Sequence, residues 1–393
     1  MALRGAGHPP ERVRRARRDI LIAALLAILL VSTGCIASRS SPSQAWSGVA
    51  IDGDIAYVGT QSGEVLRVNL ERNGLVERVF SVPSGGRTDA FPGFYATPAL
   101  VDGVVYAGGF RGFVFALDAE TLTQRREPFE IQGAALSKSI VGGVVPADGR
   151  LVFGAAEGAA DGRLYVLDME LREQCTYPRR GAAATGAIWS TPTVVDGVAY
   201  FGDLAHNLHA VDIFTCESIW PSPANLAGGV VAPPLYHKGR LYVGAFSEAF
   251  YEVDAATGAV RELLLADNWF WAKAATDGER IYAPSIDGRL YAIEITSRRH
   301  VWTYPAEGEI GPILSEPATA NGLVVVGSDD ENLVALDAAG GFRVWDQRVG
   351  DKIRAPLVVD GSTVYVHSLD RRLRAYDLDT RTLLWERDLE EGR

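Results

Sequence analysis

The chain has 393 residues, of which 47% are apolar and 22% are charged, an ordinary balance that provides ample material for a folded core. Its formal net charge is −11. This acidic balance argues against nucleic acid as a partner, because nucleic-acid binding depends on basic groups that neutralise phosphates.

Residues 1–34 read as a signal peptide or membrane anchor and not as part of the fold. Five arginines between Arg12 and Arg18 precede the apolar run Ile20–Val31, which is shorter than the roughly 20 residues of a membrane-spanning helix. The sequence Ser-Thr-Gly-Cys35 follows, and small residues directly before a cysteine resemble a bacterial lipobox. We therefore expect cleavage before Cys35, lipidation of its thiol and a polar tether over residues 35–45. A short uncleaved anchor and plain secretion are the alternatives.

The arginine-rich flank is expected to stay in the cytoplasm, so the rest of the chain is predicted to lie outside it, in the periplasm or at the cell surface. Removing residues 1–34 takes away six of the 38 basic residues and two of the 49 acidic ones, which leaves 32 and 47 and a net charge of −15. We expect an acidic monomer that a lipid holds at a membrane.

From residue 46 to residue 390 the sequence repeats one unit eight times. Each unit has a turn glycine, and successive glycines are 39 to 50 residues apart, the period of a four-stranded propeller blade. The eight turn glycines are Gly53, Gly103, Gly149, Gly197, Gly239, Gly278, Gly322 and Gly361. An Asp or Asn usually precedes the glycine, and such a pair supplies the positive φ that a two-residue hairpin turn requires. A unit of this size cannot bury its own apolar face, so the copies are expected to stack.

Further markers recur at fixed places in the unit. Each third apolar strand ends in an acid or its amide, whose side chain can accept hydrogen bonds from the following turn, as expected for Asp254 and Asp377. Four units carry a tryptophan eight residues after this acid, where a large ring can cover the seam between neighbouring blades. These tryptophans are Trp220, Trp302, Trp345 and Trp385. Five units also carry a proline five residues before the turn glycine: Pro98, Pro192, Pro234, Pro317 and Pro356.

The combined pattern resembles the PQQ-type propeller repeat, which is found in quinoprotein alcohol dehydrogenases and in the periplasmic lipoprotein BamB. The resemblance covers roughly residues 46 to 390. It implies an all-β fold, an eight-bladed β-propeller of four-stranded antiparallel blades. Whether the ring closes with whole blades, or with a strand from the tether joining blade eight, stays open. The repeat says less about function, because propellers carry many unrelated activities.

The residues can be compared with those of the quinoproteins. In those enzymes a quinone lies between a tryptophan floor and a disulfide of two adjacent cysteines, and carboxylate and amide groups bind Ca²⁺. This sequence contains neither a Cys-Cys pair nor a CxxCH haem motif. We therefore expect no cofactor, neither PQQ nor calcium, and a PQQ-dependent quinoprotein dehydrogenase is the alternative function.

Other catalytic and metal-binding patterns are missing from the sequence as well. No GxSxG, HExxH or phosphate-binding loop occurs. His206 and His209 are three residues apart on a turn and strand, where their side chains point to opposite faces, so they make a poor ligand pair. The acidic run 329–331 is interpreted as a solvated hairpin turn, with calcium binding as the alternative.

Two cysteines follow the third strands of units three and four. An extracytoplasmic location permits a disulfide between Cys175 and Cys216. However, the two stand at different offsets, seven residues after Asp168 and four after Asp212, and a bridge requires Cα atoms within about 7 Å. A disulfide and two buried thiols are both compatible with the sequence.

The residues just before the first strand of each unit, here called the lead-in segments, are expected to line the mouth of the central channel. By alignment of the repeats, the mouth residues are Trp46, Tyr95, Thr97, Trp189, Ser190, Trp271, Lys273, Glu316 and Arg354. Aromatic residues and arginine dominate binding energies at protein interfaces, so this set predicts a site for a peptide strand or loop of a partner. Packed rings and water are the alternative. The sequence thus predicts a non-catalytic scaffold that binds proteins of the cell envelope, similar to BamB.

Overall fold

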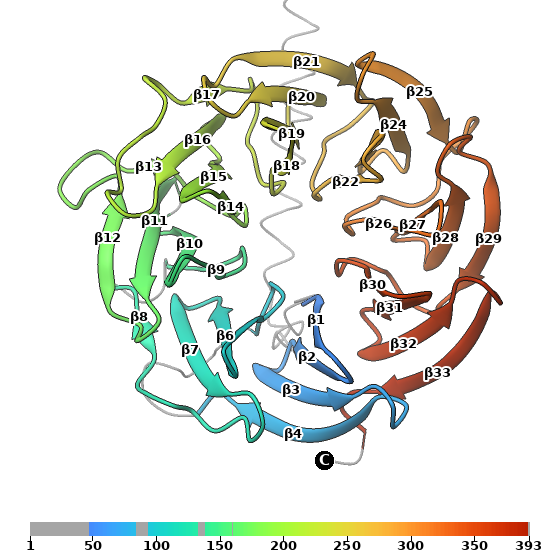
Figure 1. Cartoon of the computed structure of the whole chain (residues 1–393), viewed down its shortest axis with the longest axis horizontal. Helices are drawn as coiled ribbons and strands as arrows, with labels where there is room; N and C mark the ends of the chain where they lie inside the picture. The colour runs from blue at the N-terminus through green and yellow to red at the C-terminus, as the bar shows by residue number, and fades with distance from the viewer. Residues whose placement is uncertain (1–46, 84–92, 133–137, 159, 392–393) are drawn as a thin grey trace, which may run out of the picture. The chain divides into compact units, whose positions relative to one another are not determined.

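Each copy of the repeat folds into an antiparallel sheet whose strands follow one another in chain order, because tight turns join them. The computed structural model describes residues 47–83, 93–132, 138–158 and 160–391. Eight sheets succeed one another around a common axis as the blades of a propeller, from β1 in blade one to β33 in blade eight (Figure 1). The predicted all-β, eight-bladed fold is confirmed.

The first strand of each blade lies nearest the axis, and the fourth lies at the rim (Figure 1). The first strands are β1 (Val49–Asp52), β5 (Ala99–Val101), β9 (Val145–Ala147), β14 (Thr193–Val195), β18 (Leu235–His237), β22 (Ala275–Thr276), β26 (Ala318–Ala320) and β30 (Val358–Asp360). The second strands are β2 (Ile55–Gly59), β6 (Val104–Gly109), β10 (Arg150–Ala156), β15 (Val198–Gly202), β19 (Arg240–Gly244), β23 (Arg280–Pro284), β27 (Leu323–Gly327) and β31 (Thr363–His367).

The outer two strands of each blade carry the marker residues. The third strands are β3 (Glu64–Asn69), β7 (Phe113–Asp118), β11 (Asp161–Asp168), β16 (Asn207–Asp212), β20 (Ala249–Asp254), β24 (Leu290–Glu294), β28 (Asn332–Asp337) and β32 (Arg372–Asp377). The fourth strands are β4 (Leu75–Ser81), β8 (Phe129–Glu130), β12 (Glu173–Tyr177), β17 (Ala224–Asn225), β21 (Val260–Leu265), β25 (Arg299–Tyr304), β29 (Arg343–Arg348) and β33 (Thr382–Asp388). Blade three has one addition to the predicted four strands, because β13 (Thr185–Gly186) pairs with the start of β11.

The predicted hairpin turns form in five blades. In two other blades the turn is shifted by one residue, and in one blade it is longer. In five blades both residues of the Asp-Gly, Lys-Gly or Asn-Gly pair have positive φ, as for Asp102 (49°) and Gly103 (70°). In blades one and eight the turn lies one residue later, because Asp52 and Asp360 still belong to their strands. In blade six the turn has three residues, and Asp277 caps it by accepting the Arg280 N–H at 2.6 Å.

Buried apolar side chains fill the seams between blades. Within the described ranges they form eight clusters, and each cluster joins two neighbouring blades. The middle strands are therefore buried on both faces, as in β6, whose six residues are all buried. This burial removes the alternation of buried and exposed residues that a sheet with one wet face would show.

Blade one and blade eight close the ring as whole blades. Val58 and Leu66 of blade one share a buried cluster with Tyr365 and Leu373 of blade eight. Each of these blades is built from one continuous stretch of chain, and β33 pairs with β32. The seam is therefore closed by side-chain packing, in the manner of the other seams (Figure 1).

The tryptophan marker covers seams as predicted. The Trp220 indole of blade four donates a hydrogen bond to the Ala255 carbonyl of blade five at 3.0 Å. The Trp302 indole of blade six makes the same contact to Ala338 of blade seven at 3.3 Å. Each ring thus combines apolar burial with a hydrogen bond to the next blade.

Several predictions on the N-terminal part lie outside the described residues. These are the signal segment 1–34, the tether 35–45 with its lipidated Cys35, and Trp46. In the part of the chain that the structure describes, no helix has the length and apolar character needed to cross a membrane.

Candidate functional site

A cavity of about 270 Å³ lies where the lead-in segments converge. The structure brings seven predicted mouth residues together in its lining: Tyr95, Thr97, Trp189, Trp271, Lys273, Glu316 and Arg354. Ser190 does not line it, because this residue is fully buried and its hydroxyl donates to the Ala232 carbonyl at 3.3 Å. The lead-in segments therefore form the channel mouth as the repeat alignment predicts.

One side of the mouth is aromatic. The Trp189 and Trp271 rings lie 6.4 Å apart between centroids and are inclined by 54°. Phe246 stacks on Trp271 at 5.8 Å and on Trp269 at 4.6 Å, and Trp269 is 41% exposed. These four residues, here called the aromatic wall, run from the exposed surface into the cavity and offer rigid apolar contact area.

Sequence reasoning missed two members of the aromatic wall. Phe246 comes from the turn between β19 and β20, which the alignment of lead-in segments does not include. Trp269 does precede Trp271 by two residues in the same lead-in segment. In an extended chain, residues two apart point to the same side, whereas Phe270 between them is fully buried. The spacing Trp-Phe-Trp was therefore a usable signal.

A further part of the mouth, beginning two residues after Trp271, is charged. The Lys273 ammonium lies 3.3 Å from the Glu316 carboxylate. Although 29% of the Glu316 side chain is accessible, burial in the channel wall raises the pKa of its carboxyl, and Lys273 opposes that shift. Burial thus disfavours the charged form of Glu316, and Lys273 is the cation that favours it.

Arg354 is held by a residue of the acidic run. Its Nε and Nη2 donate to the two carboxylate oxygens of Asp329 at 2.8 and 2.6 Å. These hydrogen bonds raise the pKa of the guanidinium, against the effect of burial. Lys352 also lies 3.6 Å from Asp329. The bidentate geometry fixes the Arg354 side chain at the mouth.

The interpretation of residues 329–331 as a solvated turn is wrong in one respect. The run does lie in the turn between β27 and β28, but its carboxylates are engaged. Asp329 binds Arg354, Asp330 accepts a hydrogen bond from Asn332 at 2.7 Å, and Glu331 pairs with Arg348 at 2.8 Å. Within the described ranges, no group of three or more His, Cys, Asp or Glu residues is arranged to hold a metal ion.

The two histidines of blade four are placed separately. His209 is buried in β16, and its Nε2 lies 2.9 Å from the Asp203 carboxylate. Burial disfavours the charged carboxylate, but hydrogen bonds from His209 and Asn207 outweigh it and lower the pKa of Asp203. His206 lies in the turn before the strand with a φ of 76°. His209 therefore binds Asp203 of the turn between β15 and β16, and His206 is part of that turn.

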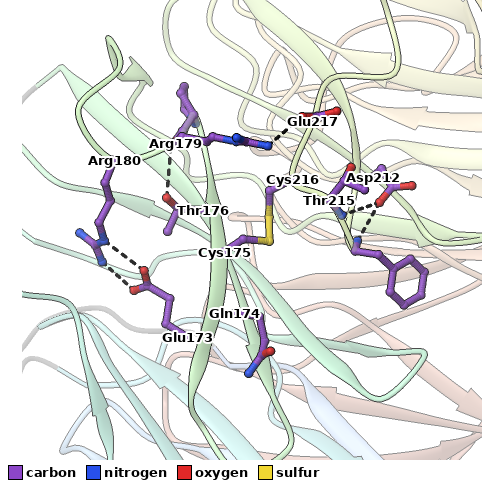
Figure 2. Close-up of a disulfide and its surroundings, with 12 residues drawn as sticks. Glu173, Gln174, Cys175, Thr176, Arg179, Arg180, Asp212, Thr215, Cys216 and Glu217 are labelled. Atoms are coloured by element: carbon purple, nitrogen blue, oxygen red, sulfur yellow. Dashed lines mark hydrogen bonds and ion pairs between the residues drawn. A yellow bond between two sulfur atoms is a disulfide. The ribbon is translucent and has the colours of Figure 1, made fainter.

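A disulfide joins Cys175 of β12 to Cys216 in the turn after β16, with the Cα atoms 6.1 Å apart (Figure 2). Both residues belong to the outer part of their blades, and neither lines the cavity. The Trp189 and Trp271 rings of the mouth are inclined by 54° and so do not form a parallel pair of surfaces. The residues present therefore do not fit the quinone of the resembling dehydrogenases.

Comparison with known proteins gives one consistent family. The family described as outer membrane protein assembly factor BamB matches residues 29–174, 183–321 and 287–393. The chain is 30% identical over 182 residues to that assembly factor from Moranella endobia, a match that covers 42% of this chain and 45% of that protein. It is 24% identical over 304 residues to the one from Shewanella oneidensis, covering 70% of this chain and 74% of that protein. The chain thus spans about half the length of the first of these relatives.

Solved structures agree on the fold. BamB from Moraxella catarrhalis matches with a TM-score of 0.65 at 18% identity, over 82% of this chain and 91% of that one. Quinohemoprotein alcohol dehydrogenase from Comamonas testosteroni matches with a TM-score of 0.66 at 16% identity, over 84% of this chain and 70% of that one. At these identities the likeness shows the propeller fold alone.

Proposed function

Because the chain belongs to the family of the outer membrane protein assembly factor BamB, we propose that it is a non-catalytic scaffold that binds proteins of the cell envelope and assists the assembly of outer-membrane proteins. Its place would be outside the cytoplasm, anchored to a membrane through a lipid on Cys35. The match of the family to nearly the whole chain supports this role over the dehydrogenase alternative.

The observation that carries the proposal is the divided chemistry of the mouth. The aromatic wall offers apolar area, and rings of this kind lose little side-chain freedom on binding. In the same mouth, Lys273 and Glu316 form an ion pair that a polar partner group can exchange into. A cavity of about 270 Å³ has room for one or two side chains, so we infer that a loop or extended segment of a protein inserts there.

Site-specific photo-crosslinking in intact cells tests this proposal. A photoreactive phenylalanine analogue replaces Trp269 at the mouth, and in a matched variant it replaces Phe342, which is 62% exposed in the turn after β28. We expect position 269 to yield a discrete crosslink to an envelope protein of the assembly machinery, and position 342 to yield none. The same products from both positions, or none from position 269, would contradict the proposed site.

Alanine variants measure the contribution of the wall. Trp189→Ala or Trp271→Ala is expected to lower partner capture about 30-fold, as for a hot-spot residue worth roughly 2 kcal/mol. Unchanged capture by both variants would dispose of the mouth as the binding surface. If added PQQ and Ca²⁺ raised the melting temperature and supported dye-linked alcohol oxidation, the dehydrogenase alternative would replace the scaffold.

A further inference from the structure

We infer that the Cys175–Cys216 disulfide is a covalent version of the tryptophan clamp that closes other seams, and that its reduction opens one seam and loosens the segment that carries Trp189. A tryptophan clamp is defined here as a seam tryptophan, eight residues after the marker acid of one blade, that lies on a glycine in the turn after the marker acid of the next blade. The coupling to the mouth rests on the proposed function, whereas the equivalence of disulfide and clamp does not.

The clamp has the same geometry at the glycines that follow the marker acids of blades five and seven. Trp220 lies so close to Gly258 of the next blade that a Cβ added there would come within 2.9 Å of the indole. Gly258 N donates to the carbonyl of the marker acid Asp254 at 2.8 Å, and its φ is 75°. Gly341 stands in the same way against Trp302, with a φ of 70°. A glycine suits this site because its φ is positive and the ring leaves no room for a Cβ.

Cys216 occupies the glycine site of blade four. Its N–H donates to the carbonyl of the marker acid Asp212 at 2.8 Å, as Gly258 N–H does to Asp254, and its φ is 54°. Its side chain therefore points toward the preceding blade, which is where the clamping ring would lie. Figure 2 shows Cys216 reaching from this turn to β12 of blade three.

Cys175 occupies the tryptophan site of blade three. It pairs with Val166, two residues before the marker acid Asp168, and the register shifts directly after that pair. Trp302 pairs in the same way with Ala292, two residues before its own marker Glu294, again next to a register shift. The turn after Asp168 is one residue shorter, so the offset in sequence is seven instead of eight. The two cysteines stand at different distances from their marker acids because Cys175 occupies the position of a seam tryptophan and Cys216 the position of the glycine that faces it.

At the periphery of this seam the Tyr177 ring of blade three also packs on Phe201 and His209 of blade four. Across it, Arg179 pairs with Glu217 at 2.8 Å, but both side chains are more than 60% exposed, and such pairs contribute little. Deeper in the seam an apolar cluster of both blades persists, so the ring is expected to stay folded without the disulfide. From β12 the chain crosses from the rim to the axis and places Trp189 in the mouth. The disulfide therefore adds to the contacts of the segment 178–190, in which Arg163 donates to the Pro178 and Arg179 carbonyls and the Gly186 N–H donates to Asp203 of blade four at 3.2 Å.

The chemical step is thiol–disulfide exchange with an external dithiol. Cys175 is half-buried and Cys216 is 2% exposed, so a dithiol thiolate would attack the Cys175 sulfur and release Cys216. The second thiolate of the dithiol then closes its own disulfide and releases Cys175. Two electrons and two protons pass from the dithiol to the cysteines, the S–S bond breaks, and the dithiol ends as a disulfide.

The test compares four states of the full chain by amide hydrogen exchange and thermal melting. These are the oxidised protein, the protein reduced with dithiothreitol and alkylated, Cys175→Ser/Cys216→Ser, and Cys175→Trp/Cys216→Gly. We expect the second and third states to exchange residues 178–190 at least about 10-fold faster and to melt about 5–10 °C lower. The Trp/Gly variant restores the clamp, so it should regain most of the protection from exchange and most of the melting temperature. Dithiothreitol should not change either quantity in this variant.

Each result decides one part of the inference. The inference that the disulfide holds the seam closed is wrong if mass mapping finds both cysteines free in the isolated protein. It is also wrong if the Ser/Ser variant exchanges and melts like the oxidised protein. If the Trp/Gly variant exchanges as fast and melts as low as the Ser/Ser variant, the disulfide is not equivalent to a tryptophan clamp. If reduction speeds exchange but leaves the crosslink from position 269 unchanged, the coupling to the mouth is wrong. Failure to crosslink in every state refutes the proposed function and leaves the seam result intact.

Discussion

Blade five meets its two neighbours through different chemistry. At the seam with blade four, Trp220 is 2% exposed and lies on Gly258, and its indole donates to the Ala255 carbonyl at 3.0 Å. At the seam with blade six, the glycine site holds Arg298, whose Nε donates at 3.0 Å to Glu252, a carboxylate only 5% exposed. One seam is closed by a buried ring, the other by an ion pair in which the carboxylate is buried and the arginine is 40% exposed.

The backbone at the two seams is nevertheless the same. Arg298 has a φ of 57°, and its N–H donates to the carbonyl of the marker acid Glu294 at 2.8 Å, as in the glycine turns. In each turn the side chain at this site faces the preceding blade, because the turn geometry is shared. The repeat therefore fixes where the seam contact lies, while the side chains decide whether it is a ring, a disulfide or an ion pair.

Loss of the tryptophan at the seam between blades four and five should destabilise the protein most. Trp220→Ala removes a buried ring and a hydrogen bond and leaves a cavity between blades four and five. We expect the free energy of unfolding to fall by about 3–5 kcal/mol, measured by chemical denaturation. Trp269→Ala is the matched control, because that ring is 41% exposed and its loss should leave stability nearly unchanged. Equal losses for the two variants would show that the clamp adds nothing to its seam.

A smaller effect is expected when the charge side is broken. Arg298→Ala leaves the Glu252 carboxylate buried with the Tyr242 hydroxyl at 3.3 Å as a remaining partner. Because Arg298 is 40% exposed and its loss is partly compensated by water, we expect a destabilisation of about 2 kcal/mol, less than for a fully buried pair. The control is Arg261→Ala on β21, an exposed arginine at the tryptophan position of this seam.

The outcome of a further substitution separates charge from packing at this seam. In Arg298→Ala/Glu252→Gln the remaining buried group is neutral, so most of the lost stability should return. If the double variant is as unstable as Arg298→Ala, the arginine acts by packing its apolar stem and not by neutralising Glu252.

Most of the fold could be predicted from local signals. Turn glycines, marker acids and seam tryptophans each act within one unit, so counting residues between them was enough to place eight blades. Counting failed where register matters. Cys175 pairs like a seam tryptophan although it stands at a different offset, because one turn is a residue shorter. Strand β13 was missed because two residues, Thr185 and Gly186, give no periodic signal.

The site was predictable to the extent that it belongs to the repeat. Trp189, Trp271 and Glu316 lie at aligned lead-in positions, so their meeting at the axis follows from the symmetry of the fold. Phe246 comes from another turn, and the pairing of Arg354 with Asp329 joins residues 25 apart in sequence through the packing of blades seven and eight. Such contacts depend on side-chain direction in three dimensions, which spacing alone does not give.

A weaker, pH-dependent effect is expected at the seam between blades eight and one, which closes the ring. There His367 of blade eight is buried, and its Nδ1 lies 2.8 Å from the carbonyl of Ser47, just before blade one. Burial lowers the pKa of His367, while the Ser47 carbonyl and the nearby carboxylates of Asp370 and Glu390 oppose that shift and Arg374 adds to it. The folded state therefore keeps this imidazole neutral where an exposed histidine would be charged.

The sign of the pH effect follows from this difference. In the unfolded chain the pKa of His367 is about 6.5. Below that pH the unfolded state therefore binds a proton at this histidine, whereas the folded state does not until the pH falls to its lower pKa. The stabilisation is fully present above about pH 6.5 and is lost as the pH falls toward the lower folded pKa. Between pH 7.5 and 5.5 the expected loss is at most about 1.4 kcal/mol. In His367→Asn the amide can still donate to Ser47 without titrating, so its melting temperature should fall less over this range. Parallel pH profiles for the two proteins would show that the closing seam, unlike the seam between blades five and six, does not depend on the charge of a buried group.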